Sequence, residues 1–359
     1  MYSNPELVLK GAFLESSICW QSPSNIALIK YWGKYGIQLP QNPSLSITLN
    51  NAVTKTKVTY AYSTTGKIET QLVFNDGEAP LFHEKINVFL KSILPIFPFL
   101  SQLKMTIESS NTFPHSAGIA SSASAMSALA LCLCSIENKL FSSLSNASDF
   151  FNKASYVARL GSGSASRSVY GGLVLWGKYD EINESSNEFA VPLRENIHPN
   201  FATLHDAILI VSDQEKKVSS TKGHSLMHGH PFEKARFEQA RANMKVLLSA
   251  LKDGDIPQFI EVVENEALSL HAMMMTSKES FLLMEPATIH IIDKIRFFRK
   301  ENKVDICFTL DAGPNIHLIY SEKDKHHVKG FIENDLLKNG LIKNWIDDCV
   351  GDGPKIIKE

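Results

Sequence analysis

Four short segments carry residue types that could bind anions or move protons. The first, residues 114–124, reads PHSAGIASSAS and lies at the mouth of a long apolar segment. A helix N-terminus leaves backbone N–H groups unpaired and carries partial positive charge, so small residues there admit a phosphate and serine hydroxyls add hydrogen bonds. Because it lacks Gly-Lys-[Ser/Thr] and Gly-x-Gly-x-x-Gly, it is neither a Walker loop nor a dinucleotide loop. The segment fits both an anion site and a capped, tightly packed core helix.

The second segment, residues 22–34, joins an apolar strand to a turn. Its sequence SPSNIALIKYWGK ends in an aromatic pair flanked by Lys30 and Lys34. A lysine supplies a point charge that suits a diphosphate, and Tyr31 supplies a hydroxyl donor. The alternative is a strand end with solvated lysines and a buried Trp32.

Glycines alternate with serines in the third segment, residues 159–168, which reads RLGSGSASRS. Such a backbone can wrap an anion, and Arg167 can hold a carboxylate or phosphate through paired hydrogen bonds. A flexible loop with one surface arginine is the alternative.

The fourth segment, TLDAGPN at residues 309–315, places an aspartate at the end of a strand. Asp311 could form a turn, or it could present its carboxylate into a cleft as a base. Taken alone, the turn is the simpler interpretation, and only the combination of segments favours the base.

Strands must position most of these segments, and a helix must position the first. Residues 109–136 lack any charge, and the serines near the start of this stretch are a poor lipid-facing surface, so a buried helix is expected there rather than a membrane span. Alternation and helical spacing predict the remaining elements. They are strands at 53–62, 68–74, 171–176, 207–212, 305–310 and 316–320, and helices at 119–137, 146–159, 232–251, 256–271, 287–300 and 325–339.

The composition excludes several classes of protein. With 359 residues, 44% of them hydrophobic, and 36 Lys and Arg against 38 Asp and Glu, the chain is globular and nearly neutral. No basic run suggests nucleic acid or a membrane as partner. The five scattered cysteines form no Cys-x-x-Cys pair, and the first residues lack the features of a secretory signal, so a cytoplasmic location is expected. Polar residues 180–200 predict a boundary between domains 1–190 and 191–359.

The four segments, with SLSITL at 44–49, occur in the order found in the GHMP superfamily of small-molecule kinases, and the chain most resembles its mevalonate diphosphate decarboxylase family. The match runs from residue 22 to residue 315, and YWGK at 31–34 and GSGSASRS at 161–168 indicate the decarboxylase branch. The resemblance implies an α+β, two-domain GHMP-kinase fold. Its N-terminal half would be like domain 2 of ribosomal protein S5, its C-terminal half ferredoxin-like, and the active site would lie in the interdomain cleft.

The activity that the resemblance implies is ATP-dependent decarboxylation of (R)-5-diphosphomevalonate to isopentenyl diphosphate, ADP, phosphate and CO2, with Mg²⁺, in the mevalonate pathway of isoprenoid biosynthesis. A tertiary hydroxyl is a poor leaving group, so the γ-phosphoryl group of ATP is first placed on it. Loss of phosphate then builds positive charge at C3, and the carboxylate departs as CO2. Asp311 would orient or deprotonate the hydroxyl and stabilise that charge.

The same resemblance implies a role for each matched residue. Catalytic roles fall to Asp311, Arg167 and Lys34, with Arg167 holding the substrate carboxylate. The implied substrate-binding residues are Tyr31, Trp32, Gly33, Lys34, Ser162, Gly163, Ser164, Ala165, Ser166, Arg167, Ser220 and Thr221. The implied ATP-binding residues are Gly118, Ala120, Ser121, Ser122, Ser124, Lys216 and Lys217. No protein ligand to a metal is implied.

Three alternatives remain open at this stage. A mevalonate-type kinase would stop after phosphoryl transfer, a related decarboxylase would act on the 5-phosphate, and a non-catalytic GHMP-fold sensor would show erosion at Asp311 or in the phosphate loop. The histidines His224, His228 and His230 could suggest a metal site, but no Cys or Glu completes a ligand set. The flexible start of a helix is therefore expected there instead. The resemblance also implies a homodimer.

Overall fold

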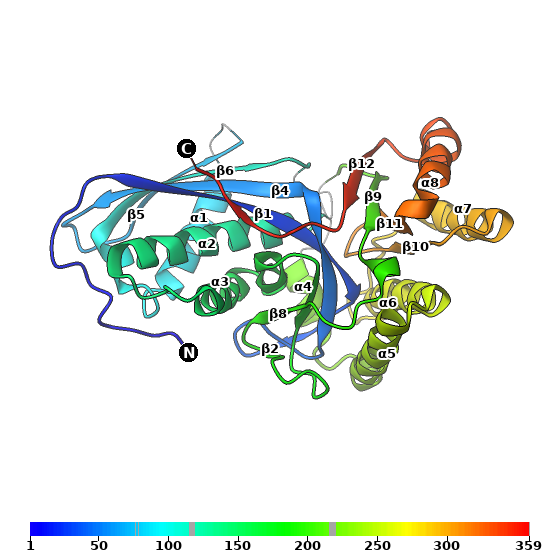
Figure 1. Ribbon diagram of the computed structural model, residues 1–359, viewed down its shortest axis with the longest axis horizontal. Coiled ribbons are helices and arrows are strands. Elements are labelled where there is room, and N and C mark those ends of the chain that lie inside the picture. Colours follow the sequence, from blue (N-terminus) through cyan, green and yellow to red (C-terminus); the bar gives the residue numbers. More distant parts are fainter. Residues whose placement is uncertain (76, 78, 115–118, 215–219, 359) are drawn as a thin grey trace.

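Two β-sheets organise the chain, which the computed structural model describes over residues 1–75, 77, 79–114, 119–214 and 220–358 (Figure 1). The larger sheet has the strand order β13-β1-β4-β6-β5, with β7 paired to β4 and β8 paired to β7. Its strands are β1 (Ser16–Ile29), β4 (Ser44–Tyr62), β5 (Glu69–Phe74), β6 (Leu103–Asn111), β7 (Leu173–Trp176), β8 (Ala190–Leu193) and β13 (Lys355–Ile356). The hairpin of β2 (Lys34–Tyr35) and β3 (Leu39–Pro40) lies just beyond β1.

The long antiparallel pair β1–β4 forms the backbone of this sheet. Their register runs from Ser16 opposite Tyr60 to Ile29 opposite Leu45, with irregularities that divide the pair near Pro23 and Ala27. The second half of β4 pairs with β6 and its first half with β7. As a result, the end of β1 extends toward the second sheet.

Three helices, α1 (Pro80–Ser92), α2 (Ser121–Phe141) and α3 (Ala147–Gly161), belong to this part of the chain. Small and apolar residues bury α2 almost completely, because it packs against β1, β4 and α3. The absence of charge in this segment therefore reflects its place in the core. None of the helices in the described ranges is both long enough and apolar enough to span a membrane.

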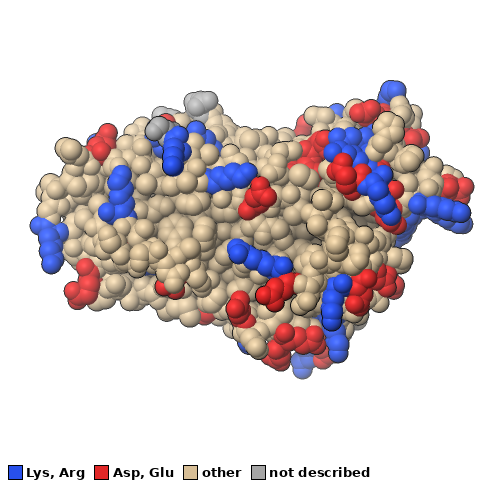
Figure 2. Space-filling view, viewed as in Figure 1, with Lys and Arg blue, Asp and Glu red and all other residues tan. Residues whose placement is uncertain are grey.

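The second sheet has the order β10-β11-β9-β12 and is covered by the later helices. Its elements are β9 (Leu204–Ile210), β10 (Ile306–Thr309), β11 (Ile316–Ser321), β12 (Asn344–Cys349), α5 (Glu233–Asp253), α6 (Ile256–Met275), α7 (Pro286–Asn302) and α8 (Lys325–Phe331). One hydrophobic cluster contains Ile26 of β1, Ile47 of β4, Ile208 of β9 and Met244 of α5, so the core is continuous between the two sheets. Charged side chains of both signs gather over the end of the molecule that carries α5 to α8 (Figure 2).

The predicted helices at 232–251, 256–271 and 287–300 correspond to α5, α6 and α7. The predicted last helix at 325–339 is instead α8 followed by one π-helical turn at Ile332–Leu337. The sequence analysis missed α1, β6 and β12.

The side-chain carboxylate of Asp348 in β12 hydrogen-bonds to an irregular part of β4 and so links the second sheet to the first. One carboxylate oxygen accepts the backbone N–H groups of Asn50 (2.8 Å) and Asn51 (2.9 Å), and the other accepts that of Ala52 (2.7 Å). Because the side chain is buried, losing these bonds would leave N–H groups without a partner.

We expect Asp348→Asn to lower the free energy of unfolding by about 2–4 kcal/mol, because the amide presents an NH2 group where an acceptor is needed. Urea denaturation would measure the loss. The control is Asp347→Asn, since this neighbour is 46% exposed and pairs only with Lys329 among the residues described; its expected cost is below about 1 kcal/mol. Equal losses in the two variants would contradict the anchoring role.

Candidate active site

A buried lysine and a partly exposed aspartate meet where the two sheets adjoin. Lys30 directly follows β1, and its Nζ lies 2.9 Å from Oδ1 of Asp311, which follows β10. The lysine side chain is 2% exposed and that of the aspartate 28%. Burial lowers the pKa of Lys30, while the charges of Asp311 and Glu266 oppose that shift. The ion pair thus fixes a carboxylate that solvent or a ligand can still reach.

The turn that carries Asp311 is anchored through its backbone and through Asn315. The Asn315 side chain accepts hydrogen bonds from the N–H groups of Val211 (2.8 Å) and Ser212 (3.0 Å). Nε2 of His271 lies 3.1 Å from the carbonyl oxygen of Asp311. Burial lowers the pKa of His271 to about 4, so at neutral pH the ring is uncharged and can donate its Nε2–H to that carbonyl. Asp311 can therefore be part of a turn and also act as a base. Backbone groups and neighbouring side chains stabilise the turn, while the carboxylate of Asp311 faces Lys30.

Arg167 lies in a 3₁₀-helical segment, Gly163–Val169, and is 2% exposed. Its Nη1 donates to Ser44 Oγ (2.7 Å), while Nε and Nη2 donate to Asn25 Oδ1 (3.2 and 3.1 Å). These bonds fix the plane of the guanidinium, which has five N–H donors in total. The alternative of a flexible loop with a surface arginine is wrong, because Arg167 is buried and its segment packs against β1 and β4.

Tyr31 contacts this arginine, and Lys34 lies near Tyr31. The Tyr31 ring lies between Trp176 and His224, each with a centroid distance of 4.8 Å, and the Arg167 guanidinium lies 5.5 Å from the ring centroid. Burial raises the pKa of Tyr31 to about 12, so it remains a hydroxyl donor. Lys34 lies 5.9 Å from the same ring, and burial lowers its pKa to about 8.

The start of α2 presents small residues and hydroxyls. Ala120 adopts a left-handed conformation with φ 45°, and Ser24 Oγ holds the preceding carbonyl of Ile119 at 2.6 Å. Ser122 is exposed, and its Oγ lies 3.2 Å from Ser162 Oγ, which joins this helix end to the segment that carries Arg167. Ser124 is buried instead, 2.6 Å from Thr54 Oγ1. The accessible serines of this helix start are therefore Ser121 and Ser122.

The structure brings several of the predicted site residues together. Contacts connect Ser122, Ser162, Gly163, Tyr31, Lys34 and Arg167. Ala165 and Ser166 are fully buried, and Ser166 Oγ donates to the Gly163 carbonyl (2.8 Å), so both support the backbone. Gly118, Lys216, Lys217 and the side chains of Ser220 and Thr221 lie outside the described residues.

Trp32 and the histidines occupy the far side of this turn. Trp32 is 5% exposed in a cluster with Met227 and Leu270, as in the alternative of a buried tryptophan. His224 stacks near both aromatic rings and its Nδ1 accepts the Gly33 N–H (3.1 Å), whereas His230 contacts a backbone carbonyl and His228 is exposed. Among the described residues, no three His, Cys, Asp or Glu side chains are grouped to hold a metal.

Sequence reasoning considered Lys30 only as one of two lysines that could suit a diphosphate, and it did not foresee the pairing with Asp311. It also gave no role to Asn25, Ser44 or Glu266. A signal for Lys30 was present in the sequence, because this lysine directly follows the apolar run IALI. If that strand lies at a junction between domains, the lysine becomes buried and needs a charged partner. No local signal singles out Glu266, which lies more than two hundred residues away in the chain.

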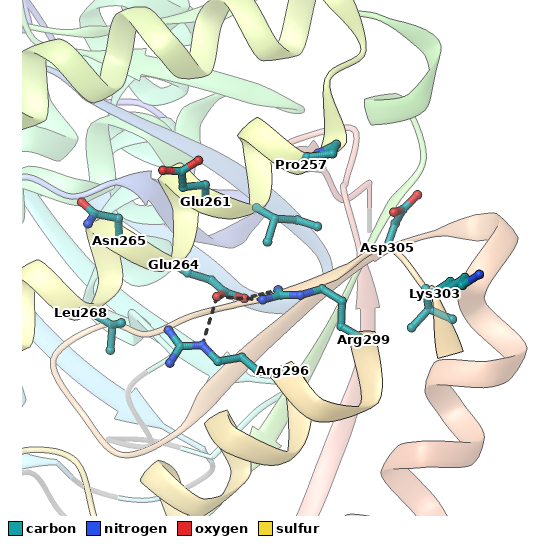
Figure 3. A pocket seen from close by; sticks show the side chains of 11 residues that line it. Pro257, Glu261, Glu264, Asn265, Leu268, Arg296, Arg299, Lys303 and Asp305 are labelled. Carbon is teal, nitrogen blue, oxygen red and sulfur yellow. Dashed lines mark hydrogen bonds and ion pairs between the residues drawn. The ribbon is translucent and has the colours of Figure 1, made fainter. Parts of the chain in front are cut away.

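A hollow of about 730 Å³ lies elsewhere, between α6 and α7 (Figure 3). On its wall Glu264 pairs with Arg299 (2.5 Å) and Arg296 (3.5 Å). None of the predicted site residues lines it. Since its most buried charges neutralise one another, we assign the chemistry to the Lys30–Asp311 region.

Comparisons with known proteins identify the family of the chain. The model of the diphosphomevalonate decarboxylase-like N-terminal domain matches residues 22–188, and that of the mevalonate 5-diphosphate decarboxylase C-terminal domain matches residues 207–347. Diphosphomevalonate decarboxylases from Gibberella zeae and Candida albicans are each 30% identical to the chain, covering 86% and 90% of it and 82% and 89% of their own lengths. The chain belongs to the diphosphomevalonate decarboxylase family.

Solved structures of this family share its fold. Mevalonate diphosphate decarboxylase from Staphylococcus aureus has a TM-score of 0.81 at 30% identity, covering 96% of this chain and 99% of its own. The complex of MDDEF with MVAPP, AMPPCP and magnesium has a TM-score of 0.81 at 27% identity, covering 96% of this chain and 100% of its own. The predicted two-domain GHMP-kinase fold is thus confirmed.

Proposed function

We propose that this member of the diphosphomevalonate decarboxylase family converts (R)-5-diphosphomevalonate and ATP to isopentenyl diphosphate, ADP, phosphate and CO2. The observation that carries the proposal is the pairing of Asp311 with Lys30 beside an Arg167 guanidinium fixed by Asn25 and Ser44. A kinase needs only the carboxylate, whereas a decarboxylase also needs a cation that holds the substrate's own carboxylate. Similarity to the MDDEF complex with MVAPP and AMPPCP supports the same assignment.

The described residues divide the reaction between them. Asp311 orients the 3-hydroxyl toward the γ-phosphoryl group and accepts its proton. The partly exposed carboxyl group then passes this proton to solvent, and the negative charge so restored stabilises the cation at C3. Arg167 holds the substrate carboxylate in the geometry from which CO2 leaves. Tyr31 and Lys34 bind the diphosphate, and the N–H groups and serines at the start of α2 bind the phosphates of ATP.

Magnesium fits this site as an ion carried by the nucleotide. It prefers oxygen ligands, usually keeps waters, and binds substrate phosphates. The hydroxyls of Ser121 and Ser122 would complete such a ligand set. When bound, the ion neutralises phosphate charge; positioning remains the task of the side chains.

The test is to incubate the protein with ATP and, in turn, mevalonate, its 5-phosphate and its 5-diphosphate, and to measure ADP and CO2 separately. We expect both products in equal amounts from the 5-diphosphate. ADP without CO2 would indicate the kinase, CO2 from the 5-phosphate alone would indicate the related decarboxylase, and neither product from any substrate would indicate a binding protein.

The lowered pKa of Lys34, about 8, predicts a pH-dependent KM. Below that pH the ammonium is charged and attracts the diphosphate; above it the amine is neutral, so KM for 5-diphosphomevalonate should rise by about tenfold. Steady-state kinetics from pH 6.5 to 9.5 would measure this. In Lys34→Arg the side chain stays charged, so the alkaline rise should disappear; an identical rise in both proteins would contradict the role.

We further propose that the protein is a cytoplasmic homodimer with domains 1–190 and 191–359. The five cysteines form no disulfide bond, which supports a reducing compartment, while the dimer rests on family resemblance. Light scattering on the purified protein would test the dimer.

A further inference from the structure

We propose that Glu266 and Arg236 are positioning residues that act through Lys30 on the Asp311 carboxylate. The inference rests on the proposed function, because it assigns the support of the carboxylate that the reaction uses. Glu266 lies on α6 and Arg236 on α5, and both hydrogen-bond to the backbone of Lys30.

Glu266 is a fully buried carboxylate with a complete set of donors. Its Oε2 accepts the backbone N–H of Lys30 (2.8 Å) and Nη2 of Arg236 (2.5 Å). Its Oε1 accepts Nη1 of Arg236 (3.0 Å) and Nδ2 of Asn243 (2.7 Å). A buried charge is tolerated only with such partners, so its position is sharply defined.

Arg236, which is 3% exposed, binds the carbonyl group of Lys30, whereas Glu266 binds its N–H group. Its Nη2 lies 3.3 Å from the Lys30 carbonyl oxygen, which also accepts Nδ2 of Asn42 at 3.0 Å. Both backbone polar groups of Lys30 are therefore bound by one ion pair of the second half of the chain. Because these hydrogen bonds fix the backbone of Lys30, the side chain starts from a defined position, from which its Nζ reaches Asp311.

The pair also acts on the charge of Lys30. In the described part of the chain, the charged and titratable groups that interact with Lys30 are Asp311, Glu266, Arg236, Arg167 and His271. Burial and Arg167 lower the pKa of Lys30, whereas Asp311 and Glu266 raise it. Removing the Glu266 charge should therefore let Lys30 lose its proton at a lower pH, and the carboxylate of Asp311 would lose its partner.

Helix α6 supplies a matched control. Glu264 lies two residues before Glu266, is 6% exposed, and pairs with Arg299 and Arg296 on the wall of the hollow between α6 and α7 (Figure 3). It is thus a buried glutamate–arginine pair of the same helix that faces away from Lys30. A merely structural role for Glu266 predicts that the two glutamates behave alike.

The experiment compares Glu266→Gln with Glu264→Gln through pH profiles of CO2 release. We expect Glu266→Gln to lower kcat at pH 8 by about 10- to 100-fold, because a small misplacement of a reacting group is costly. The alkaline limb of its pH profile should also shift to lower pH, because Lys30 loses its proton more easily. Glu264→Gln should stay within about twofold of the wild type, with an unmoved limb, although both variants melt earlier.

A second variant covers the case in which Glu266→Gln fails to fold. Arg236→Met combined with Glu266→Leu replaces the buried ion pair by apolar side chains of similar size, which often preserves stability. This double variant should fold, yet show the lowered kcat, because the backbone of Lys30 loses both partners. Since two opposite charges are removed together, its alkaline limb should move less than that of Glu266→Gln. A folded double variant with a wild-type profile would overturn the proposal.

A further measurement does not depend on the activity. In protein labelled with ¹³Cε-lysine, the Lys30 resonance can be identified by its loss in Lys30→Met and then titrated. We expect the Lys30 pKa to be lower in Glu266→Gln than in the wild type and in Glu264→Gln. Equal values would overturn the electrostatic part of the inference whatever the reaction is, whereas a wild type that releases no CO2 would overturn only the proposed function.

Discussion

Replacing Asp311 by asparagine is expected to lower kcat by about 10³- to 10⁴-fold, with the KM for ATP changed by less than about threefold. The asparagine keeps the size of the side chain but can neither take the proton of the hydroxyl nor stabilise a cation at C3. It also leaves Lys30, 2% exposed, without the carboxylate at 2.9 Å. In the proposed site the start of α2 holds the nucleotide phosphates, so their binding should persist.

The measurement is the rate of ADP and CO2 formation at saturating substrates, with nucleotide affinity from a fluorescent ATP analogue. Asp305→Asn is the control, since Asp305 lies one residue before the same strand but forms an exposed ion pair with Lys323. That control should keep its activity within about twofold. A rate near normal in Asp311→Asn would remove Asp311 from the catalytic residues.

Arg167→Gln should lower kcat/KM for 5-diphosphomevalonate by about 10²- to 10³-fold, a loss of roughly 3–4 kcal/mol in transition-state stabilisation. The guanidinium is held by Ser44 at 2.7 Å and by Asn25, so its remaining donors are aimed before the substrate arrives. Glutamine lacks the charge and the forked donors. It also gives up hydrogen bonds to both buried partners.

Arg167→Lys separates charge from geometry. A lysine keeps the positive charge but offers no planar fork, so it should recover part of the loss and not all of it. Stability must be compared by thermal melting, because Arg167 is 2% exposed. If both variants keep wild-type kcat/KM while remaining folded, the arginine does not contact the substrate carboxylate.

The success of the sequence predictions followed the strength of each local pattern. Helix α5 places apolar residues at helical spacing over 21 residues, and its prediction was nearly correct. Strand β12 was missed because only Asp348 among its side chains is buried, which leaves no alternation to detect. Helix α1 was missed for a related reason, since its buried side chains are limited to Ile86, Phe89 and Leu90.

The sequence by itself determined the family, which the comparisons confirm, and it predicted the reaction to be tested and the principal binding segments, because short motifs around Tyr31, Arg167 and Asp311 carry their chemistry locally. Only the tertiary structure decided that Lys30 pairs with Asp311, that Arg167 is buried against Asn25, and that Glu266 clamps Lys30. Those contacts join residues far apart in the chain. They exist because the end of β1 docks onto α6 and the second sheet, and no local period in the sequence encodes such docking.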